Sequence, residues 1–162
     1  MYSFDASSMI HVWDNYPPSN LNFNLLWTWI AEQIENKDFP ISKKALEEVG
    51  HKVPECGQWL REHNIQEFAL TSLALKTAQS IKISLNIEEE KYGKNGVGEN
   101  DLFIIAIAKE TNTTLISEES KQNKLPKLKS GYKIPAVCAL PDVAVQCISF
   151  VELLKLPTPD NP

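Results

Sequence analysis

Short apolar runs and longer stretches with helical spacing alternate along this chain, a pattern that predicts an α/β fold. Residues 2–4 and 113–116 are short runs rich in aromatic or β-branched side chains, and each ends in polar residues, so we expect both to be strands. A helix is expected to begin at Asn100, to carry Ile104 and Ala108 on its apolar side, and to end before the second strand. A helix followed directly by a buried strand is half of an α/β repeat.

The same spacing predicts the remaining elements. Helices are expected at residues 21–36, 54–63, 68–84 and 150–156, a helix capped by Ser42 between the first two, and a last strand at residues 143–148. The apolar stripes of the two longest helices are Leu26, Trp29, Ile30 and Ile34 in the first, and Phe68, Leu73, Leu75 and Ile81 in the second. We expect these helices to cover the sheet, whereas residues 157–162 form a flexible C-terminal tail.

Length and composition limit the class of protein. The chain has 162 residues, a single-domain length, and its 43% hydrophobic and 23% charged residues are typical of a globular domain. The net charge of −5 argues against a bulk nucleic-acid binder, but a bound divalent ion would offset part of it, so an RNA substrate is not excluded. The three cysteines have no Cys-x-x-Cys spacing and follow no signal peptide, so we expect a reduced, cytoplasmic protein with mostly buried thiols. No apolar run approaches the roughly 20 residues that span a bilayer, and we expect no membrane association.

Acidic residues stand at the polar ends of the expected elements. Asp5 opens a turn at residues 5–8 after the first strand, and Asp101 lies at the start of the helix before the second strand. The pairs Glu47–Glu48 and Glu118–Glu119 follow the Ser42 cap and the second strand. In open α/β sheets, functional sites form where strands end. Taken singly, each acid also fits an ordinary role as a turn hydrogen bond, a helix-dipole charge or a solvated charge.

In this order and with their apolar neighbours, these acids resemble the motifs of the PIN domain family, metal-dependent ribonucleases that include the VapC-like toxins of bacterial toxin–antitoxin pairs. The matching motifs are FDAS with Asp5 and Ser7, Ser42 with Glu48-Val49, Asp101 with Ile104 and Ala108, and Leu115-Ile116-Ser117 with an acid two residues on. The run KIPAVCALPDVAVQCISFVELL is also similar to a PIN-like subfamily with little assigned function. The resemblance covers most of residues 1–155. It departs from the commoner pattern in the glycine-rich KYGKNGVG before Asp101 and in Glu119, where many members have Asp.

The resemblance implies a single-domain, PIN-like three-layer α/β/α sandwich with a short, central, mainly parallel sheet over residues 1–156. It implies the catalytic acids Asp5, Glu48, Asp101 and Glu119, of which Asp5, Asp101 and Glu119 hold Mg²⁺ or Mn²⁺, with Ser7 and Ser117 in support. The motifs select Glu48 over Glu47 and Glu119 over Glu118. A divalent ion assists phosphodiester hydrolysis by activating water and stabilising the leaving oxygen, and Mg²⁺ needs only one or two carboxylates besides waters and phosphate oxygens.

A basic loop follows the fourth acid. Residues 120–133 contain lysines and no acid, with Tyr132 near the end. Candidates for contacts with RNA phosphates are Lys121, Lys124, Lys127 and Lys129. The alternative is a solvated loop without a ligand.

The resemblance therefore implies a Mg²⁺- or Mn²⁺-dependent endoribonuclease, the toxin of a toxin–antitoxin pair, with RNA as substrate and an antitoxin protein as partner. Trp27 and Phe23 are expected either in the core or at a partner surface, and a homodimer is left open. One alternative is a non-catalytic PIN-like module that binds RNA or protein. Another is a phosphatase-type hydrolase with Asp5 as nucleophile, but no Asp stands two residues later to serve as its acid.

Overall fold

A sheet of five parallel strands forms the centre of the computed structural model, which describes residues 1–157. In spatial order β3-β2-β1-β4-β5, the strands are Glu67–Phe68, Ile41–Ser42, Tyr2–Phe4, Thr114–Ile116 and Cys147–Ile148. The last residue of β1, Phe4, pairs with Ile41 of β2 on one side and with Ile116 of β4 on the other. Since every pairing is parallel, the carboxyl ends of all strands lie along one edge of the sheet.

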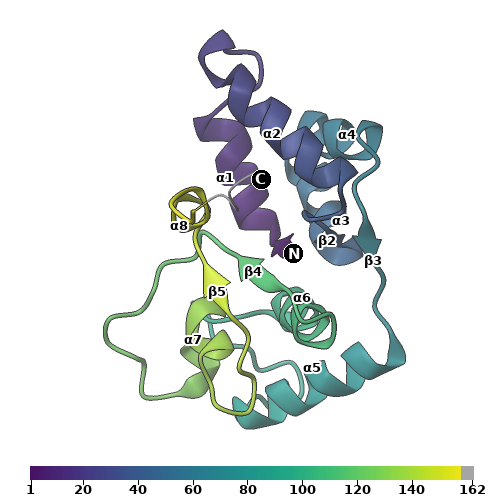
Figure 1. Ribbon diagram of the computed structural model, residues 1–162. Helices are drawn as coiled ribbons and strands as arrows, with labels where there is room; N and C mark the ends of the chain where they lie inside the picture. Colours follow the sequence, from purple (N-terminus) through teal and green to yellow (C-terminus); the bar gives the residue numbers. More distant parts are fainter. Residues whose placement is uncertain (158–162) are drawn as a thin grey trace.

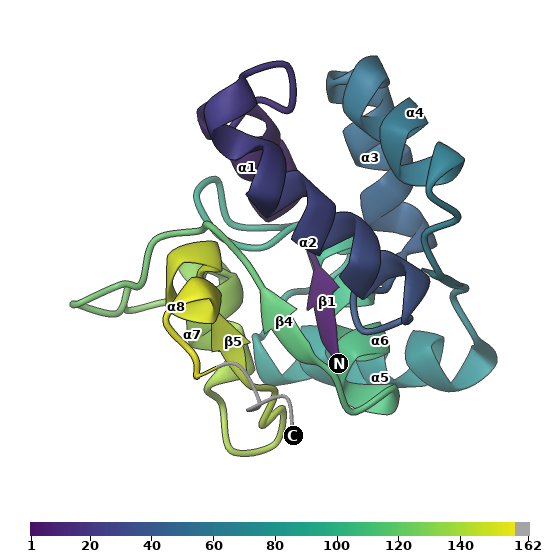
Figure 2. The same cartoon turned by 45° about the horizontal axis from the view of Figure 1, so that its top comes forward.

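Helices cover both faces of this sheet. They are α1 (Ala6–Asn15), α2 (Asn24–Glu35), α3 (Lys43–Lys52), α4 (Pro54–Glu62), α5 (Ser72–Ser84), α6 (Glu99–Glu110), α7 (Ile134–Cys138) and α8 (Phe150–Leu154). Short 3₁₀ helices occupy Leu21–Phe23 and Lys129–Gly131. In both views α1 and α2 lie on the opposite side of the strands from α5 and α6 (Figures 1 and 2). The predicted α/β/α sandwich with a short parallel sheet is therefore confirmed.

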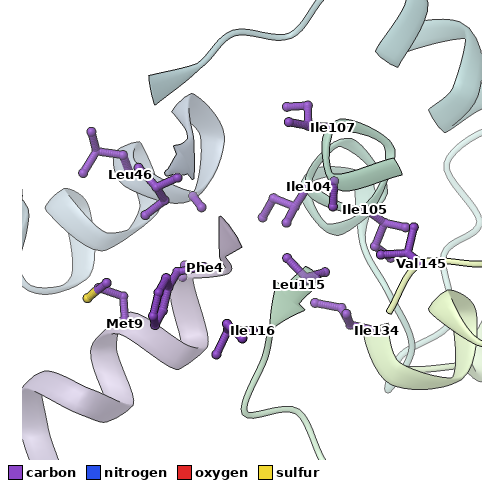
Figure 3. Close-up of a cluster of buried hydrophobic side chains, with 14 of the residues drawn as sticks. Phe4, Met9, Leu46, Ile104, Ile105, Ile107, Leu115, Ile116, Ile134 and Val145 are labelled. Carbon is purple, nitrogen blue, oxygen red and sulfur yellow. The ribbon is translucent and has the colours of Figure 1, made fainter. Parts of the chain in front are cut away.

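The core fills the two spaces between the sheet and its helices. Figure 3 shows Phe4 beside Met9 of α1 on one side, and Leu115 of β4 facing Ile104 and Ile105 of α6 on the other. All of these side chains are buried.

The cysteines are free thiols; Cys56 and Cys138 are buried and Cys147 is partly buried, as their scattered spacing predicted.

Several local expectations are wrong. Residues 5–8 do not form an isolated turn, because the Asp5 side chain caps α1 and the chain continues directly into that helix. Helix α5 begins at Ser72, since Phe68 belongs to β3, and the expected apolar stripe is displaced: Leu73 and Leu75 are exposed. The side chains that α5 buries are Ala74, Ala78 and Ile81.

Other differences affect the ends of elements. The expected strand at 143–148 is limited to Cys147–Ile148, because Ala144 has a left-handed φ of 52° that a strand cannot contain. Gly98, not Asn100, is the cap of α6. A tail was expected at residues 157–162, of which all but Pro157 lie outside the described residues.

Within residues 1–157, no helix has both the length and the apolar character needed to cross a membrane.

The aromatic residues considered for a partner surface differ in exposure. Trp27 is buried, packs edge-on against Trp13 and Trp59, and donates its indole N–H to the Tyr16 carbonyl at 2.5 Å. It belongs to the core and is unavailable to a partner. Phe23 is partly buried against the ring of Tyr16.

Candidate active site

The predicted acids approach one another at the carboxyl edge of the sheet. Asp5 directly follows β1, Glu119 comes three residues after β4, and Ser42 at the end of β2 leads into α3 with Glu48. Asp101 lies in the first turn of α6. Parallel pairing places the ends of β1, β2 and β4 side by side, so residues that are far apart in sequence meet at the edge where α/β proteins form their sites.

Asp5 is the buried centre of this cluster, with only 2% of its surface exposed. Its Oδ1 accepts a hydrogen bond from the Ser8 N–H at 2.6 Å, and its Oδ2 accepts from Ser7 Oγ at 2.8 Å and from Ser117 Oγ at 2.7 Å. Burial raises the pKa of Asp5, while these hydrogen bonds act in the opposite direction because they favour the carboxylate. The side chain is thus held in one orientation from both the start of α1 and the end of β4.

Asp101 is held by the backbone at the start of its own helix. Its Oδ2 accepts a hydrogen bond from the Gly98 N–H at 2.8 Å, which closes the N-terminal turn of α6. The pKa of Asp101 is raised to about 6, chiefly by burial and also by the negative charges of Glu119, Glu48 and Asp5, while the hydrogen bond from Gly98 acts in the opposite direction. The other three predicted acids are therefore close enough for their charges to act on Asp101.

The two glutamates after β4 have different partners. Glu119 Oε2 accepts a hydrogen bond from the Ile134 N–H at 2.7 Å, at the start of α7. Glu118 Oε1 accepts from the Phe150 N–H at 2.7 Å, at the start of α8, and its Oε2 lies 4.0 Å from His11 Nε2. Glu119 acts electrostatically on Asp101, whereas Glu118 joins α8 and α1.

The two glutamates of α3, Glu47 and Glu48, differ in exposure and in their partners. The Glu48 side chain is 28% exposed and pairs with Lys52 at 2.5 Å, and its charge contributes to the raised pKa of Asp101. The Glu47 side chain is 52% exposed and lies 3.9 Å from Lys44. Consecutive helix positions are about 100° apart, so only one of the two can face the cluster.

The donor set suits a hard divalent cation. All the candidate ligands are carboxylates, and among residues 1–157 Asp5, Asp101 and Glu119 have no salt-bridge partner. Within that range, no three acidic, histidine or cysteine side chains converge tightly enough to hold an ion as they stand. Mg²⁺ requires only one or two carboxylates and completes its shell with water and phosphate oxygens. The residues present therefore fit the ion by their chemistry.

Two further supporting groups lie beside the acids, and the sequence motifs do not single them out. Ser8 is fully buried; besides its N–H bond to Asp5, its hydroxyl donates to the Ile116 carbonyl at 2.8 Å and so joins α1 to β4. The spacing of Asp5 and Ser8 matches a helix cap and its third helical residue, a signal that points to α1. Gly98 is the second group, and an acid three residues after a cap position is a recognised start signal.

The lysine loop, residues 120–133, leaves β4 beside Glu119 and extends outward before α7 (Figures 1 and 2). Lys121 is paired with Glu152 at 2.6 Å, so one of the four lysine candidates is already engaged within the protein. The other three, Lys124, Lys127 and Lys129, are exposed.

Comparison with known proteins supports the fold. The chain matches the domain of unknown function DUF4411 over residues 2–157. Its structure is similar to a chain in the crystal structure of VapBC2 from Rickettsia felis bound to a DNA fragment from their promoter, with a TM-score of 0.57 and 15% identity. That similarity covers 92% of this chain and 98% of the other. No curated protein sequence matches this chain. The structural likeness agrees with the predicted PIN-like fold.

Proposed function

The chain belongs to the DUF4411 family, and from that starting point we propose that it is a metal-dependent ribonuclease that hydrolyses RNA phosphodiester bonds at its acidic cluster. The observation that carries the proposal is the meeting of four carboxylates from four separate stretches at one sheet edge, where burial and the charges of the other three raise the pKa of Asp101. A cluster of like charges costs stability unless a cation joins it. Such a cation can promote phosphodiester hydrolysis by activating water and stabilising the leaving oxygen.

In this proposal each residue has a definite task. Asp5, Asp101 and Glu119 would hold Mg²⁺ or Mn²⁺, and the ion supplies Lewis acidity and charge neutralisation at the phosphate. Ser7 and Ser117 orient Asp5 through their hydroxyls, and the Gly98 N–H orients Asp101. Glu48 has one oxygen engaged by Lys52 and the other available to orient the attacking water and receive its proton.

Cleavage should depend on the ion. We expect the purified protein to cut single-stranded or structured RNA with Mg²⁺ or Mn²⁺ and to stop on addition of a chelator, because the carboxylates alone would repel the phosphate. Gel analysis of labelled RNAs with metal, with chelator, and with metal restored measures this. Cleavage that survives chelation would contradict the proposed chemistry. Intact RNA under every metal condition would favour the non-catalytic PIN-like module that binds RNA or protein.

The likeness to a VapBC2 chain supports a proposal about biology: the protein is the toxin of a pair and is neutralised by a small antitoxin protein. Its free, mostly buried thiols suit the reducing cytoplasm in which such a toxin would act. We expect expression of the protein alone to slow bacterial growth, and expression of the Asp5→Asn variant to slow it much less. Equal growth with and without the protein at matched expression would argue against a toxin. A homodimer remains a prediction.

Glu48 should matter more than its neighbour. We expect Glu48→Gln to lower the cleavage rate by roughly a hundredfold or more, because it removes a group that orients or deprotonates water. Glu47→Gln is the matched control, with the same change in charge one residue away on a more exposed side chain. Initial rates for both proteins at saturating Mg²⁺ measure the difference. If Glu47→Gln is the impaired protein, the register of α3 at the site is wrong by one residue.

A further inference from the structure

A groove with mostly apolar walls lies between the base of the lysine loop and helix α7. Its volume is about 550 Å³, and its lining includes Leu125 and Tyr132 from the loop and Ala136 and Leu140 from α7 or just beyond it. A site of this composition can receive a flat, partly apolar group beside the ring of Tyr132. The proposed hydrolysis does not itself use this groove.

The groove adjoins a second depression that contains one of the four acids, Glu119. This depression of about 410 Å³ is lined by Ser117 and Glu119, and it shares Lys121, Pro135 and Cys147 with the groove. The two hollows therefore adjoin along those shared residues. An RNA strand whose phosphate lies beside Glu119 can therefore place a neighbouring nucleotide in the groove.

Hydrogen bonds fix the conformation of the lysine loop, which forms one wall of the groove. The side chain of Gln122 closes its base: Nε2 donates to the Gly131 carbonyl at 3.1 Å, and Oε1 accepts from the Lys133 N–H at 2.9 Å. The glycine-rich segment before α6 supports it from outside, since the Val97 N–H donates to the Tyr132 carbonyl at 2.9 Å. These hydrogen bonds hold the backbone at Tyr132 on both sides, so the groove is formed before any ligand binds.

Charge identifies the kind of ligand. Residues 120–133 carry five lysines and no acid, whereas the adjoining site is strongly acidic. Lys124 and Lys127 are exposed close to Leu125, and the Lys133 ammonium donates to the hydroxyl of Ser120 at 3.1 Å. An apolar groove bordered by cations complements a nucleotide, whose base is flat and apolar on its faces and whose phosphate is anionic.

We propose that this groove is a base-binding subsite, which takes an unpaired nucleotide of the RNA next to the scissile phosphodiester. The base packs against Tyr132, and the flanking phosphates lie near Lys124 and Lys127. This inference rests on the proposed nuclease function, and it adds a substrate class. The RNA must be unpaired next to the cleaved bond, because a base that is paired within a duplex cannot enter the groove between the lysine loop and α7.

Binding of a short single-stranded RNA tests the subsite separately from cleavage. We measure fluorescence anisotropy in the Asp101→Asn background with Mg²⁺, and a gel verifies that the probe stays intact. Tyr132→Leu should weaken binding roughly fivefold to a hundredfold, the range for removing one aromatic ring on which a base stacks, while Tyr132→Phe should bind like the Asp101→Asn protein. Lys124→Gln with Lys127→Gln should lower the slope of log Kd against log salt by about two, because each lysine neutralises one phosphate.

Matched controls lie elsewhere on the surface. Trp59→Leu removes an aromatic side chain from a different hollow, of about 770 Å³, and Lys37→Asn with Lys76→Gln removes two lysines distant in sequence from the loop. Both should leave RNA binding unchanged, and a competing duplex of the same sequence should bind more weakly.

Tyr132→Leu binding RNA as tightly as the Asp101→Asn protein would overturn the subsite. So would Trp59→Leu weakening RNA binding as much as Tyr132→Leu does. If neither Tyr132→Leu nor the double lysine substitution changed RNA binding, the groove would instead be a candidate site for a protein partner. If the parent protein cleaves RNA and Tyr132→Leu binds normally, the subsite alone fails. If the parent neither binds nor cleaves RNA, the proposed function fails with it.

Discussion

Asp101→Asn is expected to remove most RNA cleavage while leaving the protein at least as stable as the parent. The substitution removes a proposed metal ligand, and loss of one group that stabilises a transition state costs about 3 kcal/mol, or roughly a hundredfold in rate. Asparagine keeps an oxygen that can accept the Gly98 N–H, so the start of α6 is preserved. It also removes a partly buried charge on which three neighbouring carboxylates act unfavourably. Cleavage rates and thermal unfolding of the two proteins measure both effects.

The pH dependence of stability gives an independent check on Asp101. Its pKa in the folded protein is raised from the usual 3.8 to about 6, so the folded state binds this proton more tightly than the unfolded state does. The stabilisation is complete below the unfolded value and is lost as pH rises through the folded value. Without metal, the parent should lose thermal stability between about pH 4 and about pH 6.

The asparagine variant should show a smaller loss over the same interval. Some loss will remain, because burial also raises the pKa of Asp5 and gives it the same sign. Mg²⁺ should raise the melting temperature of the parent more at pH 7.5 than at pH 5, since protons and metal compete for the same carboxylates. Equal pH profiles for parent and variant would contradict the burial of a titrating Asp101. Full activity in the variant would contradict its role as a ligand.

Glu119→Gln is expected to be severely impaired, and Glu118→Gln to keep most of its activity. Glu119→Gln removes a negative charge that acts on Asp101. The cleavage rate should fall roughly a hundredfold, which is the effect of removing one group that stabilises the transition state. Its amide oxygen can still accept the Ile134 N–H, so α7 should keep its position. Glu118→Gln keeps an acceptor for the Phe150 N–H and loses only the attraction to His11, away from the proposed chemistry.

Initial cleavage rates and melting temperatures of this pair separate the two roles. We expect the rate to fall in Glu119→Gln with little change in stability, and stability to change more than the rate in Glu118→Gln. The reverse pattern would place Glu118 in the site and shift the motif after β4 by one residue. Full activity in both proteins would leave neither glutamate in the site.

Much of the fold was determined by the sequence alone, because its signals are local. The apolar run of β1, the β-branched run before Ser117, and the helical spacing of α2, α4 and α6 each depend on a few neighbouring residues, and the elements lie close to where the pattern predicts them. The Ser42 cap is also local: its hydroxyl accepts the Ala45 N–H at 3.1 Å, as the sequence suggests. The order of the acids and their apolar neighbours is enough to predict which positions should form a site.

Local signals fail where an element is very short or where burial depends on distant residues. Strands β2 and β3 have two residues each and cannot show an alternating pattern, and the first residues of α1 are small and polar, which favours a turn over a helix. The exposed Leu73 and Leu75 and the buried Trp27 show that hydrophobicity alone does not identify the covered face of a helix.

The sequence by itself determined the α/β class and the central strands, since these follow from residue type and spacing, and its resemblance to the PIN motifs supplied the candidate acids. Only the tertiary structure decided how those acids are held and which groups surround them. Parallel pairing brings Asp5 within 2.7 Å of Ser117, 112 residues away, and burial together with neighbouring charges raises the pKa of Asp101. The different partners of Glu118 and Glu119 also arise from packing, because α7 and α8 present their first backbone N–H groups to adjacent glutamates. Distances, burial and mutual repulsion between such residues depend on the whole folded chain and have no local signature.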